Sequence, residues 1–182
     1  MDDLVRLAEL IKKRNVLECE ITALIARPAA IGHIGEYIAS RIFHIALDDS
    51  ASRKGIDGYF RDGSLKGRSV NIKWYAVREG ILDITPECLP DYYLVLTGPR
   101  PIAMTSRGRG RPWTIDGVYF FESRALTEQL PMRGVKVGVA GSVAQPMWEQ
   151  AQAYPNQRSV ELVLTGEQLE RIMLFGAAPS DG

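Results

Sequence analysis

The 182-residue sequence has little of the chemistry that usually marks a metal or disulfide protein. It contains two cysteines and two histidines. Cys19 and Cys88 are far apart and have no histidines at zinc-ligand spacing, so the sequence suggests neither a disulfide framework nor a zinc site. His33 and His44 are too isolated to be proposed as zinc ligands.

Membrane and secretion signals are also missing. No apolar run approaches the length that crosses a bilayer. The first residues begin with two acids and are polar throughout, which is wrong for a signal peptide. We therefore expect a cytoplasmic protein with no membrane partner.

Net charge of one sign is lacking as well, because 22 basic residues balance 22 acidic ones. The whole molecule therefore offers no broad electrostatic attraction to nucleic acid, and such binding would need a local basic patch. No Ser/His/Asp grouping, P-loop or dinucleotide fingerprint occurs either. These absences leave few enzyme classes that a short motif would identify.

The composition is that of an ordinary globular protein, with 46% hydrophobic and 24% charged residues. A chain of 182 residues suits one domain with a sizeable core, and no internal repeat or linker divides it. We predict a single domain over residues 1–182, with a frayed tail at 177–182.

Hydrophobic periodicity predicts both helices and strands, and hence an α/β (α+β) fold. The helical stripe of the first segment is Leu4, Leu7, Leu10 and Ile11. The expected helices cover residues 2–14, 16–26, 32–44, 123–130 and 166–175. The expected strands cover residues 55–60, 68–75, 92–97, 118–121, 135–140 and 160–165.

Two of these strands carry the most informative patterns. In residues 68–75, Val70, Ile72 and Trp74 point one way while Asn71, Lys73 and Tyr75 point the other way. Residues 92–97, YYLVLT, form a near-continuous apolar run, which is typical of a strand buried on both faces.

Three charged residues stand in a suggestive order along this pattern: an acid on a helix, an acid in a strand and a lysine in the next strand. They are Glu36 in GHIGEYIAS, Asp57 in KGIDGYF and Lys73 in VNIKWY. On a helical wheel Glu36 lies at the edge of the apolar arc, and Gly32 and Gly35 in the same turns would let another element approach closely.

On these motifs the chain resembles the PD-(D/E)XK superfamily of restriction-endonuclease-like nucleases, and specifically an uncharacterised bacterial branch of it. That family has a helix with a glutamate, then a β-meander whose second and third strands carry an aspartate and an acid-x-lysine motif, then a further helix and strand. The resemblance covers residues 32–97, with YYLVLT as the closing strand of a mixed sheet flanked by helices. Residues 98–176 would be a C-terminal β/α elaboration.

The resemblance implies a Mg²⁺-dependent (or Mn²⁺-dependent) nuclease that hydrolyses phosphodiester bonds in DNA. It implies a metal site made of Asp57, Glu36 and the carbonyl of Ile72, with Lys73 as the catalytic lysine and Asn71 completing the site. The chemistry is consistent, because magnesium prefers oxygen ligands and a lysine ammonium offsets charge that develops on the phosphate.

One residue departs from the family pattern, because Asn71 stands where an acid is usual. Asparagine offers a carbonyl oxygen but removes one negative charge, and Glu36, Glu79 or Asp83 could compensate. The alternatives are a catalytically inactive nuclease-fold module that binds nucleic acid or a protein, and an interaction domain of unrelated α/β fold. The strand register that would set Asp57 beside Lys73 is left open by the sequence.

A local basic patch is present in the Arg107-Gly-Arg-Gly-Arg111 loop. Arg107, Arg109 and Arg111 could contact phosphates while Trp113 stacks on a base, although such loops are more often simply solvated. Lys54 near the expected site could serve likewise, as could Lys66 and Arg68. DNA is thus the expected partner, and a homodimer is a further expectation from the resemblance.

Overall fold

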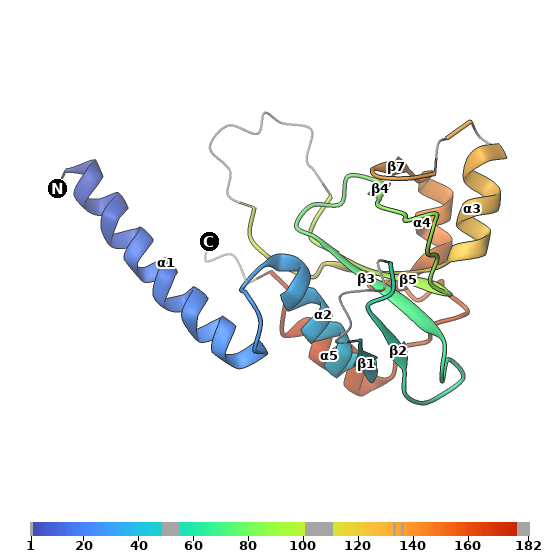
Figure 1. Ribbon diagram of the computed structural model, residues 1–182, viewed down its shortest axis with the longest axis horizontal. Coiled ribbons are helices and arrows are strands. Elements are labelled where there is room, and N and C mark those ends of the chain that lie inside the picture. Colours follow the sequence, from blue (N-terminus) through green and yellow to red (C-terminus); the bar gives the residue numbers. More distant parts are fainter. Residues whose placement is uncertain (1, 49–54, 101–110, 133, 136, 178–182) are drawn as a thin grey trace.

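The computed structural model describes residues 2–48, 55–100, 111–132, 134–135 and 137–177. Within them a six-stranded sheet has helices on both of its faces, and a two-stranded sheet lies beside it (Figure 1). The helices are α1 (Asp3–Ile25), α2 (Ile31–Ile42), α3 (Ser123–Met132), α4 (Gln145–Ala151) and α5 (Gly166–Met173). The strands are β1 (Ile45–Leu47), β2 (Gly58–Phe60), β3 (Ser69–Tyr75), β4 (Ile81–Leu82), β5 (Tyr92–Thr97), β6 (Gly117–Glu122), β7 (Gly141–Ser142) and β8 (Gln152–Tyr154).

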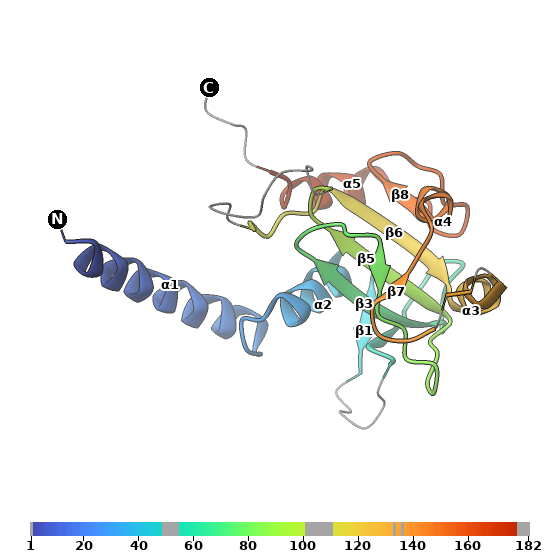
Figure 2. The same cartoon turned by 90° about the horizontal axis from the view of Figure 1, so that it is seen from above.

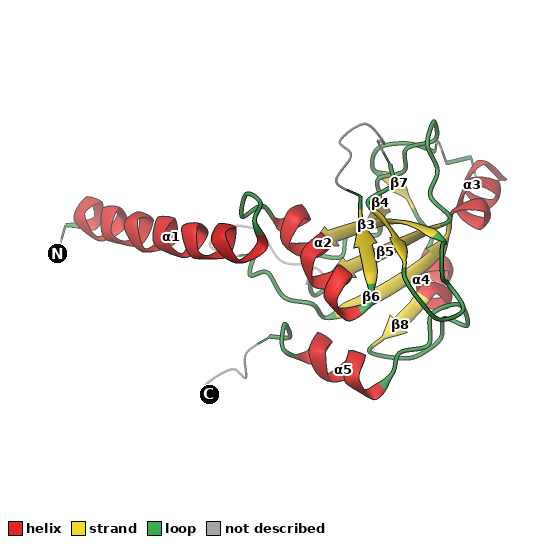
Figure 3. Ribbon diagram, turned by 60° about the horizontal axis from the view of Figure 1, so that its bottom comes forward, coloured by secondary structure: helices red, strands yellow, loops and turns green. Residues whose placement is uncertain are grey.

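The main sheet is mixed, with the strand order β1-β2-β3-β5-β6-β8. Figure 3 shows its strands β3, β5, β6 and β8. Strands β1, β2 and β3 form an antiparallel meander. Strand β5 then runs parallel to β3, while β6 and β8 return to antiparallel pairing. The predicted α/β (α+β) class is therefore confirmed.

Two hydrophobic cores lie on the two faces of this sheet, which makes the fold three-layered (Figure 2). One core joins Leu94 of β5 to side chains of α2 and α5. The other joins Val95 of the same strand to α3, α4 and β4. Every residue of β5 is buried, as its apolar sequence predicts.

Strand β3 shows the predicted alternation. Val70, Ile72 and Trp74 belong to the core under α2, while Tyr75 packs against the opposite core. The seven-residue strand is paired on both sides, with β2 along its first part and with β5 along most of its length. It is therefore the element that carries Asn71 and Lys73 into the middle of the sheet.

The N-terminal segment differs from its prediction. The two helices expected at residues 2–14 and 16–26 are one continuous 23-residue helix, α1, capped by the side chain of Asp2. It ends at Ala26, which takes a left-handed conformation (φ 55). No helix in the described part of the chain is long and apolar enough to span a bilayer.

The strands also differ from their predictions. Strand β1, which is separated from the end of α2 by two residues, was not predicted, so the observed meander begins one strand earlier. Residues 160–165 are not a strand, because the side chain of Gln157 accepts and donates the hydrogen bonds that a neighbouring strand would supply. The described residues of 135–140 form turns, and the sheet instead ends at β8.

Candidate functional site

Asp57 lies immediately before β2, and the register of β2 with β3 sets its position. Gly58 pairs with Val70, so Asp57 comes beside Asn71. The N–H of Asp57 donates to the carbonyl of Val70 (2.9 Å). The N–H of Ile72 donates to Oδ2 of Asp57 (2.6 Å), so the aspartate is bonded to the residues on both sides of Asn71.

The glycine after Asp57 makes this position possible. A Cβ on Gly58 would lie 2.4 Å from the carbonyl oxygen of Ala46 in β1, which no side chain can tolerate. Strand β1 can therefore approach β2 closely only because residue 58 is glycine. The close pairing fixes the backbone from which the Asp57 carboxylate projects.

Glu36 is brought toward β3 by the close packing of α2. A Cβ on Gly35 would lie 2.9 Å from Cβ of Trp74, so the prediction of a close approach is confirmed at this residue. It is wrong for Gly32, which has nothing within 4 Å of that position. The Glu36 side chain is 18% exposed and forms an ion pair with Arg27.

Electrostatics connect the predicted residues with one another. Burial raises the pKa of Asp57, and the nearby Glu36 carboxylate raises it further. The hydrogen bond from Ile72 and the charges of Lys73 and Arg27 oppose that rise without cancelling it. Glu36 and Lys73 thus each lie within electrostatic range of Asp57, and burial disfavours the ionised form of its carboxyl group.

Asn71 adds an unusual feature to the group. Its side chain is 4% exposed, and Oδ1 has no hydrogen-bond partner among the described residues. A buried acceptor without a partner costs roughly 1–3 kcal/mol, so such groups usually have an unseen ligand or water. Lys73 follows two residues later on the same face of β3 and is partly buried. We call Glu36, Asp57, Asn71 and Lys73 the candidate site.

These oxygen atoms suit a hard divalent cation better than a transition metal. Magnesium is commonly held by one or two carboxylates and keeps several waters. Two carboxylates and the free Oδ1 of Asn71 match that requirement in type and number. Within the described ranges no group of three or more His, Cys, Asp or Glu side chains could hold a metal ion. The N–H of Ile72 donates to Asp57, whereas the role of its carbonyl as a metal ligand stays a prediction.

The two other acids considered as replacements for the missing acid at position 71 have different settings. Oδ1 of Asp83 accepts from the N–H of Ala140 (2.7 Å), and Oδ2 accepts from the hydroxyl of Tyr75 (3.4 Å). Asp83 therefore ties the small β4–β7 sheet to β3. Glu79 is exposed. Neither residue is among the main causes of the raised pKa of Asp57.

The predicted nucleic-acid-binding residues are only partly covered by the structure. Lys54, Arg107 and Arg109 lie outside the described residues. Arg111 is exposed. Trp113 is 46% exposed and contacts the ring of Trp74, with 6.2 Å between the ring centroids. Since Trp74 follows Lys73 directly, the end of the arginine-rich loop lies next to β3.

A polar pocket that the sequence did not suggest lies between α2 and the start of β1. Its volume is about 520 Å³, and Arg41, His44, Arg61 and Asp62 are among the residues that line it. His44 takes a left-handed conformation (φ 53), and its Nδ1 lies 2.8 Å from Oδ2 of Asp62. Among the described residues neither arginine has an ion-pair partner. Such a pocket has the charge and donors that bind a phosphate.

Arg27 was also missed, and no sequence signal distinguishes it. It lies two residues after α1, in a stretch that reads as a connection before Pro28. Only the reversal of the chain at Ala26 turns its guanidinium toward Glu36.

The sequence matches no family model, and it matches no curated protein.

Proposed function

We propose that the chain is a Mg²⁺-dependent (or Mn²⁺-dependent) nuclease of restriction-endonuclease-like fold that hydrolyses phosphodiester bonds in DNA. The observation that carries this proposal is the partly buried Asp57 carboxylate beside the unpartnered Oδ1 of Asn71, with Glu36 and Lys73 close enough to shift its pKa. A protein rarely keeps a desolvated charge and a free buried acceptor together unless a ligand uses them.

The order of elements supports the same proposal. Helix α2 carries the glutamate, β2 follows the aspartate, β3 carries the lysine, and β5 lies parallel to β3. This order is similar to the helix, meander and closing strand that the resemblance to the nuclease core implies. The core departs from that pattern between β3 and β5, where the described residues 76–91 form turns and β4 in place of a helix.

In this proposal the residues of the candidate site have distinct roles. Asp57 and Oδ1 of Asn71 would hold the cation, and Glu36 would be a third ligand if its ion pair with Arg27 were broken. Such a cation, when bound, polarises the phosphate and lowers the pKa of a bound water. Lys73 donates a hydrogen bond to a phosphate oxygen and offsets the negative charge that grows there. Arg41 and Arg61 contact a second phosphate along the strand.

The second candidate is a catalytically inactive nuclease-fold module that binds nucleic acid or a protein. Two observations favour it: Asn71 replaces the usual acid, and Arg27 already neutralises Glu36. Both lower the negative charge available to a divalent cation. DNA binding would then persist without cleavage, since phosphate contacts depend on the arginines and not on the carboxylates.

Plasmid cleavage with Mg²⁺ or Mn²⁺ tests the first candidate. We expect Asp57→Asn and Lys73→Met each to lower the cleavage rate at least 100-fold, because each removes a group that acts on the reacting phosphate. Lys12→Met, which removes an exposed lysine from α1, serves as the matched control and should keep the rate.

Three outcomes are distinguishable. Cleavage that survives both site substitutions would refute the proposed site. Salt-dependent DNA binding without cleavage, weakened by Arg61→Ala with a salt slope lower by about one, would support the inactive module. Neither cleavage nor DNA binding under any metal condition would refute both candidates.

A further inference from the structure

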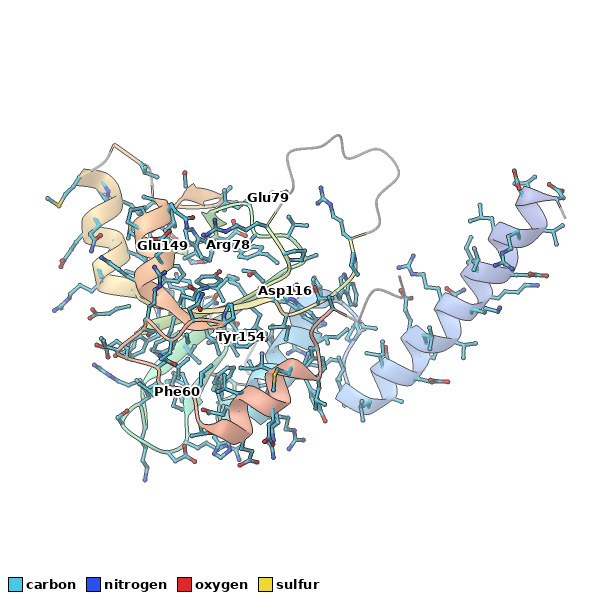
Figure 4. All side chains as sticks on the ribbon, turned by 180° about the vertical axis from the view of Figure 1, so that it is seen from behind. Phe60, Arg78, Glu79, Asp116, Glu149 and Tyr154 are labelled. Carbon is cyan, nitrogen blue, oxygen red and sulfur yellow. The ribbon has the colours of Figure 1, made fainter. Side chains whose placement is uncertain are left out.

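Helix α1 exposes an unusual amount of apolar side chain to solvent. Figures 1 and 2 show it running outward from the sheet, and in Figure 4 its side chains stand clear of the other elements. Leu4, Leu7, Leu17 and Leu24 are 73%, 52%, 58% and 71% exposed. In a protein with no net charge, an apolar surface of this size is a mark of an interaction site.

The exposed residues follow a coiled-coil spacing. Alternating steps of three and four residues connect Leu7, Leu10, Arg14, Leu17, Ile21 and Leu24. Five of these six positions are apolar, and they form one seam along the helix, which we call the α1 seam. Leu4, Ile11 and Ile25 widen it on one side. A 23-residue helix is about 34 Å long, so the seam is long enough for a stable helix pair.

An apolar groove begins where the seam ends. It has a volume of about 480 Å³ and lies between the end of α1, helix α2, the two tryptophans and α5. Leu24 and Ile25 of α1 form one wall, and Trp113 and Phe175 are among the residues of the others. The groove and the seam are thus one continuous apolar surface.

We propose that a second copy of this chain covers this surface, with the two α1 helices packed antiparallel. In that arrangement Leu7 lies opposite Leu24 of the partner subunit, and Leu4 lies opposite the partner subunit's Ile25. The first turn of each helix therefore reaches the groove at the base of the other. A standard interface takes about 20–30 residues a side, which α1 and the groove together supply.

Charge selects the antiparallel pairing. In a parallel pair the two Arg14 side chains would face each other inside the seam, which is unfavourable. In the antiparallel pair each Arg14 lies opposite Leu17 and keeps its ion pair with Glu18 of its own helix (2.7 Å). The flanking Lys13 then lies beside Glu20 of the partner subunit, so two such pairs of opposite charge form along the edge away from Leu4 and Ile25. This self-complementarity is why the occupant is a second copy.

The mass in solution tests the interface. The chain of 20.2 kDa should sediment as a dimer at micromolar concentration. Leu17→Glu should raise the dimer dissociation constant at least about 100-fold, because the symmetric dimer loses two buried leucines. Val16→Glu is the matched control: Val16 is also 58% exposed but points away from the seam, so the dimer should persist. Circular dichroism confirms that both variants remain folded. A wild-type monomer, or a dimer that Leu17→Glu leaves intact, would overturn the proposal.

Cross-linking tests the orientation in a background without Cys19 and Cys88. Cysteines at Leu10 and Ile21 of one helix are about 16 Å apart and cannot bond to each other. In the antiparallel dimer Leu10 faces the partner subunit's Ile21, so the double variant should form a covalent dimer and Leu10→Cys alone should not. A covalent dimer of Leu10→Cys alone would contradict the antiparallel arrangement.

Discussion

Replacing Asp57 with asparagine is expected to stabilise the metal-free fold at neutral pH and to abolish its response to divalent cations. The amide keeps an oxygen that accepts the hydrogen bond from Ile72. It removes a carboxylate that is partly buried and repelled by Glu36. The melting temperature at pH 7 should therefore rise. Glu170→Gln, which replaces an exposed acid on α5 by its amide, is the matched control and should have little effect.

The hydrogen bond gives a scale for the comparison with alanine. Asp57→Ala leaves the N–H of Ile72 without its acceptor, which costs about 1–3 kcal/mol. In a domain of this size 1 kcal/mol corresponds to about 2–4 °C in melting temperature. The alanine variant should thus melt about 2–12 °C below the asparagine variant. For the wild type, a cation at 100 times its dissociation constant should add about 2.7 kcal/mol, or about 5–11 °C.

The pH dependence gives an independent check of sign. Burial raises the pKa of Asp57 above its ordinary value of 3.8, so the folded state holds this proton more tightly than the unfolded state does. The wild type therefore loses stability relative to Asp57→Asn as the pH rises through that raised pKa, and the difference closes on acidification. Differential scanning calorimetry from pH 4 to pH 8 measures it. An asparagine variant that is less stable at pH 7, or that still melts higher with Mn²⁺, would refute the reasoning.

Three further predictions concern the frame around the site. Burial acts to raise the pKa of Asp91, but hydrogen bonds from Ser69 outweigh this effect and leave the pKa lowered. Asp91→Asn should therefore destabilise the fold near pH 7, and the loss of stability should vanish as the pH falls through that lowered pKa. Acid titration of unfolding measures this difference. Arg78 is buried against two aromatic rings and donates two hydrogen bonds, so Arg78→Met should cost about 2–4 kcal/mol in urea unfolding, and Arg78→Lys should recover little of it. Gly58→Ala should lower the free energy of unfolding by about 1–3 kcal/mol, because the added methyl group meets the backbone of β1. Gly32→Ala, which has open space around it, should be neutral or slightly stabilising. Equal losses of stability in the two variants would refute the packing argument.

The parts of the fold that the sequence predicted are those with strong periodicity. Alternation along residues 69–75 correctly predicts that Val70 and Asn71 point to opposite faces of the sheet, because successive side chains of a strand alternate between its two faces. The capping box at Thr165 and Gln168 marks the start of α5, since both of its hydrogen bonds are local. The sequence places Asp57 and Lys73 on consecutive segments that are also neighbours in the sheet, but the register that sets Asp57 beside Asn71 could not be predicted from it.

The remaining features depend on long-range contacts. Strand β1 has three residues and follows α2 after a single reversal at His44, so no period-two signal can develop there. The run at 160–165 looks like a strand, yet the amide of Gln157 satisfies part of its backbone locally. Likewise nothing local assigns Arg27 to Glu36, because their ion pair depends on the angle between α1 and α2.

The main sheet ends in β1 on one side and β8 on the other, each with three residues. An edge strand exposes unpaired backbone N–H and C=O groups, to which a strand of another molecule can add. Edges as short as these offer few such groups, so growth into fibres by strand addition has little template at either border of the main sheet. Fibril-sensitive dyes should accordingly stay dark in concentrated solutions of the folded protein.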